Sequence, residues 1–261
     1  MRRLVYEVSE SVRIAAAQIY ANKLRSVLTA LGVIIGIVAV TLMGTAINGI
    51  DAGVDRSFAG FGDDLLYVSK IPWRARAEWW KFRNRPPIRT EYARLINEWI
   101  AATPDSALIV AVPTVLRPLN LIRGEYRLNN IITFGTSADY ARITRSDLKS
   151  GRFFSEFEAQ NGTNVAVIGY DVANALFPAE SAVGQSIRVR DQNFQVVGVA
   201  ARQGSFLGIF SWDSMMVIPL RAFRRFSRST DDSEVRVQVD AKRIVDAREE
   251  LRGLVRRVRQ L

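Results

Sequence analysis

The sequence predicts an α+β protein in which one N-terminal transmembrane helix precedes an exported domain. Three observations predict this fold class. Residues 26–50 contain no Lys, Arg, Asp or Glu; both ends of the remaining chain alternate strand-like and helix-like segments; and a block of short β-like segments lies between those ends. We therefore expect one α/β layer built from both ends of the exported part, with a small β-rich module inserted into it.

The uncharged run Ser26–Ile50 is long enough to cross a membrane. As an α-helix it would be about 37 Å long, and the hydrocarbon core of a bilayer is about 30 Å thick. A cleaved signal peptide is one alternative, since residues 44–46 are small, although its apolar region should span only about 7–15 residues. A buried helix of a soluble protein is another. Within the run, Gly32 and Gly36 form a Gly-x-x-x-Gly pattern, which predicts close packing against a second membrane helix.

The charges on either side of the run predict its orientation. Residues 1–25 hold five Lys and Arg, whereas residues 51–65 hold one. The positive-inside rule therefore places the N-terminus in the bacterial cytoplasm and the chain after about residue 50 outside the inner membrane. Apolar residues recur at helical spacing in segment 1–25, so we expect an amphipathic helix on the membrane surface or against a partner protein; they are Val5, Val8, Val12, Ala15 or Ala16, and Ile19.

The first exported elements resemble an α/β layer. A strand is expected over 65–68 and a helix over 90–102, with Thr90 as its N-cap. A second strand is expected over 107–112 and should end at Pro113.

After this second strand the sequence pattern changes to short β-like runs, and longer elements return near the C-terminus. We expect strands at 131–135, 165–169, 186–189, 194–199 and 215–219, interrupted by one helix over 170–177. The alternation over 234–240 predicts a strand buried on one face, and 241–260 predicts a closing helix.

The composition makes most enzyme classes poor candidates. The 261 residues include neither Cys nor His, so thiolate nucleophiles, the commonest general base and the commonest metal ligand are all missing. A Gly-x-x-x-x-Gly-Lys-Ser/Thr phosphate loop is also absent from the sequence. The paired acids 63–64, 231–232 and 249–250 are typical of exposed surface. We therefore expect no catalytic residues, cofactor or metal site. An exported hydrolase that uses carboxylates or a serine is kept as an alternative interpretation.

The net charge of +10 suggests an anionic partner, but 31 of the 36 cations are Arg, which an Arg-biased genome also produces. Residues 72–89 mix six cations with aromatic side chains. Such mixtures can bind single-stranded nucleic acid, pack into a groove of their own domain, or contact a partner or lipid headgroups. We do not expect nucleic acid outside the cell, so partner or membrane contact is the functional interpretation for Trp73, Trp79, Trp80, Arg83 and Arg85. Four further arginines, at 221, 224, 225 and 228, are expected to be solvated.

Residues 22–36, Asn-Lys-Leu-Arg-Ser-Val-Leu-Thr-Ala-Leu-Gly-Val-Ile-Ile-Gly, resemble the entry to the first transmembrane helix of MacB-type, FtsX-like ABC transporter permeases. Within it the family signature at the membrane entry falls on Leu24, Arg25, Leu28, Thr29, Leu31 and Gly32. The similarity continues in the family's order through segments 150–154, 164–169, 175–178, 183–187, 194–199 and 218–220.

This resemblance implies a periplasmic core domain over 51–261. It would contain a porter-like α/β subdomain, 64–116 and 221–261, and an inserted β-rich subdomain, 117–220. It also implies a homo- or heterodimeric permease that works with a separate cytoplasmic ABC ATPase and, in some members, with a periplasmic adaptor. ATP-driven closure would be passed through the membrane helices to the periplasm, in a mechanotransmission cycle used for export or efflux.

The chain departs from the family pattern in two ways. No nucleotide-binding domain is fused to it, and the three further membrane helices of the family permease do not follow residue 261. We therefore expect a truncated permease; the alternative is a single-span periplasmic interaction or adaptor protein that is complete as written.

Overall fold

The structure is a computed structural model that describes residues 10–11, 13–15, 17–18, 20–59, 64–71, 80–82, 84–144, 147–206, 210–211, 213–226 and 233–259. The chain divides into two compact units, Met1–Arg56 and Ser57–Leu261.

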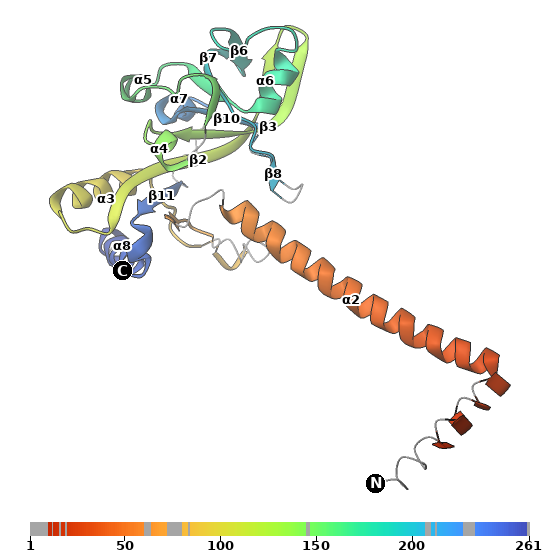
Figure 1. The fold of residues 1–261 in the computed structure, drawn as a ribbon. Coiled ribbons are helices and arrows are strands. Elements are labelled where there is room, and N and C mark those ends of the chain that lie inside the picture. Colours follow the sequence, from red (N-terminus) through yellow and green to blue (C-terminus); the bar gives the residue numbers. More distant parts are fainter. Residues whose placement is uncertain are drawn as a thin grey trace. The chain divides into compact units, whose positions relative to one another are not determined.

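A single helix, α2, runs through the whole uncharged segment and extends over Lys23–Ala59 (Figure 1). Its section Lys23–Gly49 is the one helix among the described residues that is long and apolar enough to cross a membrane. The hydroxyls of Thr29, Thr41 and Thr45 donate hydrogen bonds of 2.7–2.9 Å to backbone carbonyls four residues earlier. These hydroxyls are therefore satisfied inside the helix, as a hydrocarbon environment requires.

The segment before α2 is described only in part. Its described residues between 10 and 21 are helical. Of the residues on which the amphipathic pattern depends, Val5, Val8, Val12, Ala16 and Ile19 lie outside the described residues, and Ala15 is helical and exposed.

The second unit contains a sheet of nine strands among its described residues. Its order along the sheet is β1 (Leu65–Val68), β11 (Glu234–Val239), β2 (Leu108–Arg123), β3 (Tyr126–Thr136), β10 (Met215–Pro219), β5 (Val165–Ile168), β7 (Gln192–Ala200) and β4 (Leu148–Gly151). The β3–β10 and β5–β7 pairs are parallel and the others are antiparallel. Two short strands, β8 (Ser205–Phe206) and β9 (Phe210–Ser211), pair with each other.

Six of the strands close into a ring. The ninth strand, β6 (Ser186–Val189), pairs with both β2 and β7, so that β2, β3, β10, β5, β7 and β6 each have a neighbour on both sides. Leu121, Ile187 and Phe194 are fully buried inside a common core with residues of helices α6 (Tyr170–Leu176) and α7 (Leu220–Arg224). The β-rich module is therefore a small closed barrel, because closure lets every strand bury one face without leaving an edge.

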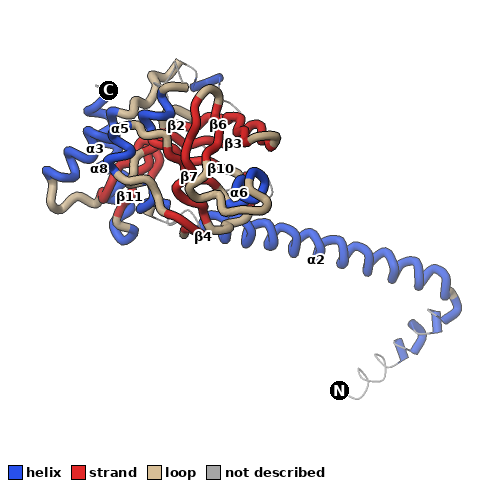
Figure 2. The backbone as a smooth tube through the Cα atoms, turned by 90° about the horizontal axis from the view of Figure 1, so that it is seen from above, coloured by secondary structure: helices blue, strands red, loops and turns tan. Residues whose placement is uncertain are grey.

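Two further cores cover the rest of the sheet. Helices α3 (Glu91–Ala102) and α8 (Ile244–Arg259), side by side in Figure 2, pack on β1, β11 and the start of β2, after the 3₁₀ turn η2 (Ala241–Arg243). The helix α4 (Tyr140–Thr144) covers the outer face of β5 and β10, and Ala159 of α5 (Glu156–Asn161) joins the same core.

The strand predicted to stop at Pro113 continues for ten more residues, through Pro113 and Pro118. The Pro113 carbonyl accepts a hydrogen bond from the Thr136 hydroxyl at the last residue of β3, so the missing N–H falls where that pairing ends. Pro118 lies between the section of β2 that pairs with β11 and the section that pairs with β6. Proline is tolerated in a strand where one side has no partner.

Two other expectations hold in part, and three helices were missed. Thr90 is the N-cap residue of α3, but its backbone angles are already helical and its side chain makes no capping hydrogen bond. The strand β11 buries the face of Val235, Val237 and Val239 as expected, but its other face is not open throughout: Arg236 is only 8% exposed, whereas Glu234 and Gln238 are half-buried. The sequence interpretation also missed α4, α5 and α7, which are too short to show a helical period.

Candidate functional site

The α2 helix presents two different faces at the membrane entry. At about 100° per residue, Arg25, Thr29, Gly32 and Gly36 share one face, and Leu24, Leu28 and Leu31 share the neighbouring one. The three leucines are 50–78% exposed, and a Cβ atom built on Gly32 or Gly36 would meet nothing within 4 Å. The signature residues therefore form an exposed surface, and no side chain projects from it at Gly32 and Gly36.

The structure describes only part of the aromatic and basic segment 72–89. Trp73, Trp79 and Arg83 lie outside the described residues. Trp80 is 58% exposed, and the Arg85 guanidinium lies 4.5 Å from the centre of the Phe82 ring. Trp80 is therefore not packed into a groove of its own domain.

The arginines expected to be solvated include two with defined partners. Arg225 donates hydrogen bonds to the Asn164 side chain at 2.8 Å and to the Gly162 carbonyl at 2.9 Å, and Arg224 donates to the Thr90 hydroxyl. Because these bonds attach α7 to the end of α5 and to the start of α3, the cluster has a structural role. Arg228 lies outside the described residues.

Two of the acidic side chains that were expected to be exposed accept hydrogen bonds from other parts of the domain. Glu250 accepts hydrogen bonds from Trp99 Nε1 at 2.9 Å, from the Ser106 hydroxyl at 2.7 Å and from the Ala107 N–H at 3.0 Å. It therefore ties α8 to α3 and to the start of β2. Asp64, only 6% exposed, accepts a hydrogen bond from Gln238 of β11 at 3.0 Å.

The family-like segment 150–154 makes a turn in which two backbones touch. Gly151 has a φ of +78°, and a Cβ atom there would lie 2.2 Å from the Val197 carbonyl oxygen. On the facing strand, a Cβ atom on Gly198 would lie 2.4 Å from the Arg152 carbonyl oxygen. Only glycine fits both positions, because each strand of the β4–β7 pair occupies the space of the other's side chain.

Beyond the turn, Arg152 holds the start of α5. Its guanidinium makes two hydrogen bonds to the Glu158 carboxylate, at 2.7 and 2.8 Å. Glu158 also accepts from the Ser155 N–H at 2.7 Å while Ser155 Oγ accepts from the Glu158 N–H, which completes a capping box. The hydrogen bond from Arg152 lowers the pKa of Glu158 from 4.5 to about 2.

Glu158→Gln should therefore make the stability of the second unit less dependent on pH. The folded-state pKa is depressed, so the carboxylate contributes stability above its unfolded pKa, and this contribution is lost as the pH falls from about 4.5 towards about 2. Glutamine keeps the capping box and removes only the charge. The melting temperature of the variant should lie a few degrees below that of the parent near neutral pH and converge with it as the pH falls to about 2. Parallel melting curves across this range would contradict the assignment.

A buried cation joins three strands at the junction between the cores. Arg236 of β11 forms an ion pair with Glu234 at 3.0 Å and donates a hydrogen bond to the Tyr140 hydroxyl at 3.2 Å. Its guanidinium carbon lies 5.4 Å from the ring centres of Phe134 and Tyr140 and 5.7 Å from that of Tyr67. Burial raises the pKa of Tyr67 to about 12 and also raises the pKa of Tyr140, so both phenols keep their protons beside the cation. The guanidinium lies within cation–π distance of all three rings.

Sequence reasoning missed this centre because the alternation in β11 predicted an exposed Arg236. The strand-forming residues on either side of Arg236 indicate a β-strand, but they do not tell which face of that strand the rest of the domain covers. The described residues contain no group of three or more His, Cys, Asp or Glu side chains placed to hold a metal ion.

The chain is similar to known export proteins over almost its whole length. The MacB-like periplasmic core domain family matches residues 26–254. The pyoverdine export ATP-binding/permease protein PvdT of Pseudomonas aeruginosa is 29% identical over 97% of this chain, and the macrolide export ATP-binding/permease protein MacB of Bdellovibrio bacteriovorus is 30% identical over 97%. The chain spans only 36% and 39% of the length of these two relatives.

Two solved structures have the same fold. The periplasmic region of MacB from Actinobacillus actinomycetemcomitans aligns with a TM-score of 0.63 at 15% identity, covering 77% of this chain and 86% of that one. The extracellular domain of the transporter YknZ from Gram-positive bacteria aligns with a TM-score of 0.52 at 19% identity, covering 70% of this chain and 88% of that one. The mixed α/β fold of the second unit is thus that of a MacB periplasmic domain. The resemblance seen in the sequence is confirmed, and the chain belongs to the MacB-like periplasmic core domain family.

Proposed function

We propose that this chain is part of the permease of an ABC exporter and converts ATP hydrolysis by a separate cytoplasmic ATPase into a conformational change outside the membrane. The observation that carries the proposal is the family match over 26–254, which includes most of the apolar helix together with the exported domain. Two relatives named as ATP-binding/permease proteins support it. In this proposal the chain is a mechanical coupler and not a catalyst.

The proposed topology has α2 crossing the inner membrane with the N-terminus in the cytoplasm. Support comes from the five cations that precede the uncharged run 26–50 and from the continuity of α2 through residues 44–46, where a signal peptide would be cleaved. Alkaline phosphatase fused after Asn161 should be active and fused after Gln18 inactive; the reverse pattern would overturn this topology.

The proposed route of coupling runs from the end of α2 into β1. Only residues 60–64 separate Ala59 from Leu65 in the chain. The strand β1 pairs with β11, and its Tyr67 ring contacts Arg236, which in turn contacts Phe134 of β3 and Tyr140 of α4. Displacement of β1 would therefore shift both the α3–α8 layer and the barrel.

We further propose the division into a porter-like subdomain, 64–116 and 221–261, and an inserted subdomain, 117–220. The core beneath α3 and α8 supports it, because every residue of that core falls within the first two ranges.

The small face of α2 is proposed as the contact with another membrane helix, of a second permease copy or a related chain. Replacing Gly32 and Gly36 together by Leu should weaken association about tenfold, because two large side chains hold the backbones apart. The measurement is energy transfer between two differently labelled copies in membranes. Gly44→Leu with Gly49→Leu, at open positions on other faces of the same helix, is the matched control. Unchanged association of the Gly32 and Gly36 variant would remove this role.

Purification of the tagged full chain from gently solubilised membranes tests the proposed function. An ABC ATPase should co-purify and be identified by mass spectrometry, and deletion of residues 1–21 should abolish its recovery while the chain stays in the membrane. Recovery of the intact chain without any ATPase would reject the permease interpretation and favour the single-span interaction or adaptor protein.

A further inference from the structure

The outer wall of the barrel carries a row of side chains across four strands. Arg127 of β3 pairs with Ile122 of β2, Ile122 pairs with Arg188 of β6, and Arg188 pairs with Asn193 of β7. Residues opposite one another in a sheet point to the same face. Their neighbours along the strands, Leu121, Val189 and Phe194, are fully buried inside the barrel, so the row faces outwards. Arg127, Arg188 and Asn193 are exposed, and Ile122 is half-buried.

The two cations in this row have no ion pair with any described residue. Other arginines nearby are bonded: Arg123 pairs with Glu180 and donates to the Leu176 carbonyl, and Arg190 donates to the Phe226 carbonyl. The acids of the same hairpins, at 125 and 191, are in the turns between the strands. The row is therefore a positively charged face with unused hydrogen-bond donors.

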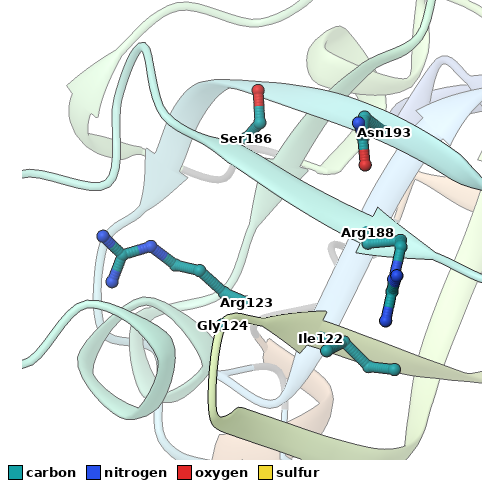
Figure 3. A pocket seen from close by; sticks show the side chains of 6 residues that line it. All are labelled: Ile122, Arg123, Gly124, Ser186, Arg188 and Asn193. Carbon is teal, nitrogen blue, oxygen red and sulfur yellow. The ribbon is translucent and has the colours of Figure 1, made fainter.

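The face is hollowed beside Arg188. A depression of about 380 Å³ is lined by Ile122, Arg123, Gly124, Ser186, Arg188 and Asn193 (Figure 3). In Figure 3, Arg188 and Asn193 extend from neighbouring strands at one end of it, and Arg123 extends away from Arg188. An apolar floor at Ile122 and a polar rim are features of a shallow protein-binding surface.

The spacing of the row indicates the shape of its partner. Arg127 and Arg188 are separated by one intervening strand, so their backbones are about 9–10 Å apart. Two turns of an α-helix rise about 11 Å and return a side chain to nearly the same face, so carboxylates seven residues apart match this separation. A strand places alternate side chains only about 7 Å apart.

We propose that this face docks an acidic helix of a partner protein, with two carboxylates on Arg127 and Arg188 and an apolar residue between them over Ile122. Charge complementarity and spacing select this occupant. The inference depends on the proposed function only in placing the face outside the cytoplasm. It is independent of the ATPase test, because that partner would act at the other side of the membrane.

Peptide binding to the full chain in nanodiscs of neutral lipid tests the proposal. The probes are two fluorescent alanine-rich helical peptides of identical composition, one with glutamates seven residues apart and one with glutamates three apart. The first should bind more tightly, and Arg127→Ser with Arg188→Ser should weaken it roughly three- to thirtyfold, with the effect decreasing as salt is added. Arg248→Ser with Arg256→Ser, which removes the same charge from exposed positions of α8, should leave binding unchanged.

Equal binding of both peptides, or equal loss in both double variants, would overturn the proposal. Binding of anionic phospholipid vesicles that depends on Arg127 and Arg188, without peptide selectivity, would overturn it in favour of a lipid contact. Because both arginines are exposed, circular dichroism should show an unchanged fold in the variant, so that lost binding is not lost structure.

Discussion

Arg236→Ala should lower the free energy of unfolding of the second unit by about 2–4 kcal/mol. Removing one member of a buried ion pair typically costs about 3–5 kcal/mol, and the Glu234 side chain is 23% exposed, which reduces the penalty of leaving it unpaired. The variant also loses the contacts of the guanidinium with three aromatic rings and its hydrogen bond to Tyr140. Urea unfolding of the full chain in detergent, followed by circular dichroism, measures the loss.

Two further variants separate the charge of Arg236 from its volume. Arg236→Met fills the space among the rings but leaves Glu234 without its partner, so it should lose less than alanine does. Adding Glu234→Gln to it removes the unpaired charge and should recover much of the remaining loss. Arg188→Ala, at an exposed position, should change stability by less than about 0.5 kcal/mol. If Arg236→Ala behaved like Arg188→Ala, the buried cation would not hold the junction together.

Gly151→Ala should destabilise the domain by about 3–5 kcal/mol. The φ of +78° alone costs an L-residue about 1–2 kcal/mol, and the new methyl group would lie 2.2 Å from the Val197 carbonyl oxygen and 2.9 Å from the Gly198 Cα. Because both contacts are with backbone, relief requires β4 to move away from β7. That movement would break the 2.8 Å hydrogen bond from the Arg152 N–H to the same carbonyl.

Gly184→Ala is the matched control for this prediction. Its φ of +88° carries a similar conformational cost, but a Cβ atom there would meet nothing within 4 Å. It should therefore lose only about 1–2 kcal/mol, and the difference between the two variants measures the close approach of β4 and β7. Equal losses in the two variants would show that the strands separate without cost.

Some parts of the candidate site could be predicted from the sequence, and others could not. The membrane helix and the family-like segments follow from local composition, and the predicted strands at 65–68, 186–189 and 215–219 have the bounds found in the structure. The helix α5 carries a sequence signal that was overlooked, a Ser155-x-x-Glu158 capping box, and helices of five or six residues offer little else. The role of Trp73, Trp79 and Arg83 stays a prediction.

The sequence by itself determined the uncharged helix, the location of most strands, and the family to which the chain belongs, because these depend on residue types at short spacing. Only the tertiary structure decided that β6 closes the barrel between β2 and β7, that Arg236 is buried, and that Arg127 and Arg188 share one face. The physical reason is that periodicity tells which side chains share a face of a strand. Which face becomes covered depends on pairing with residues far away in the chain.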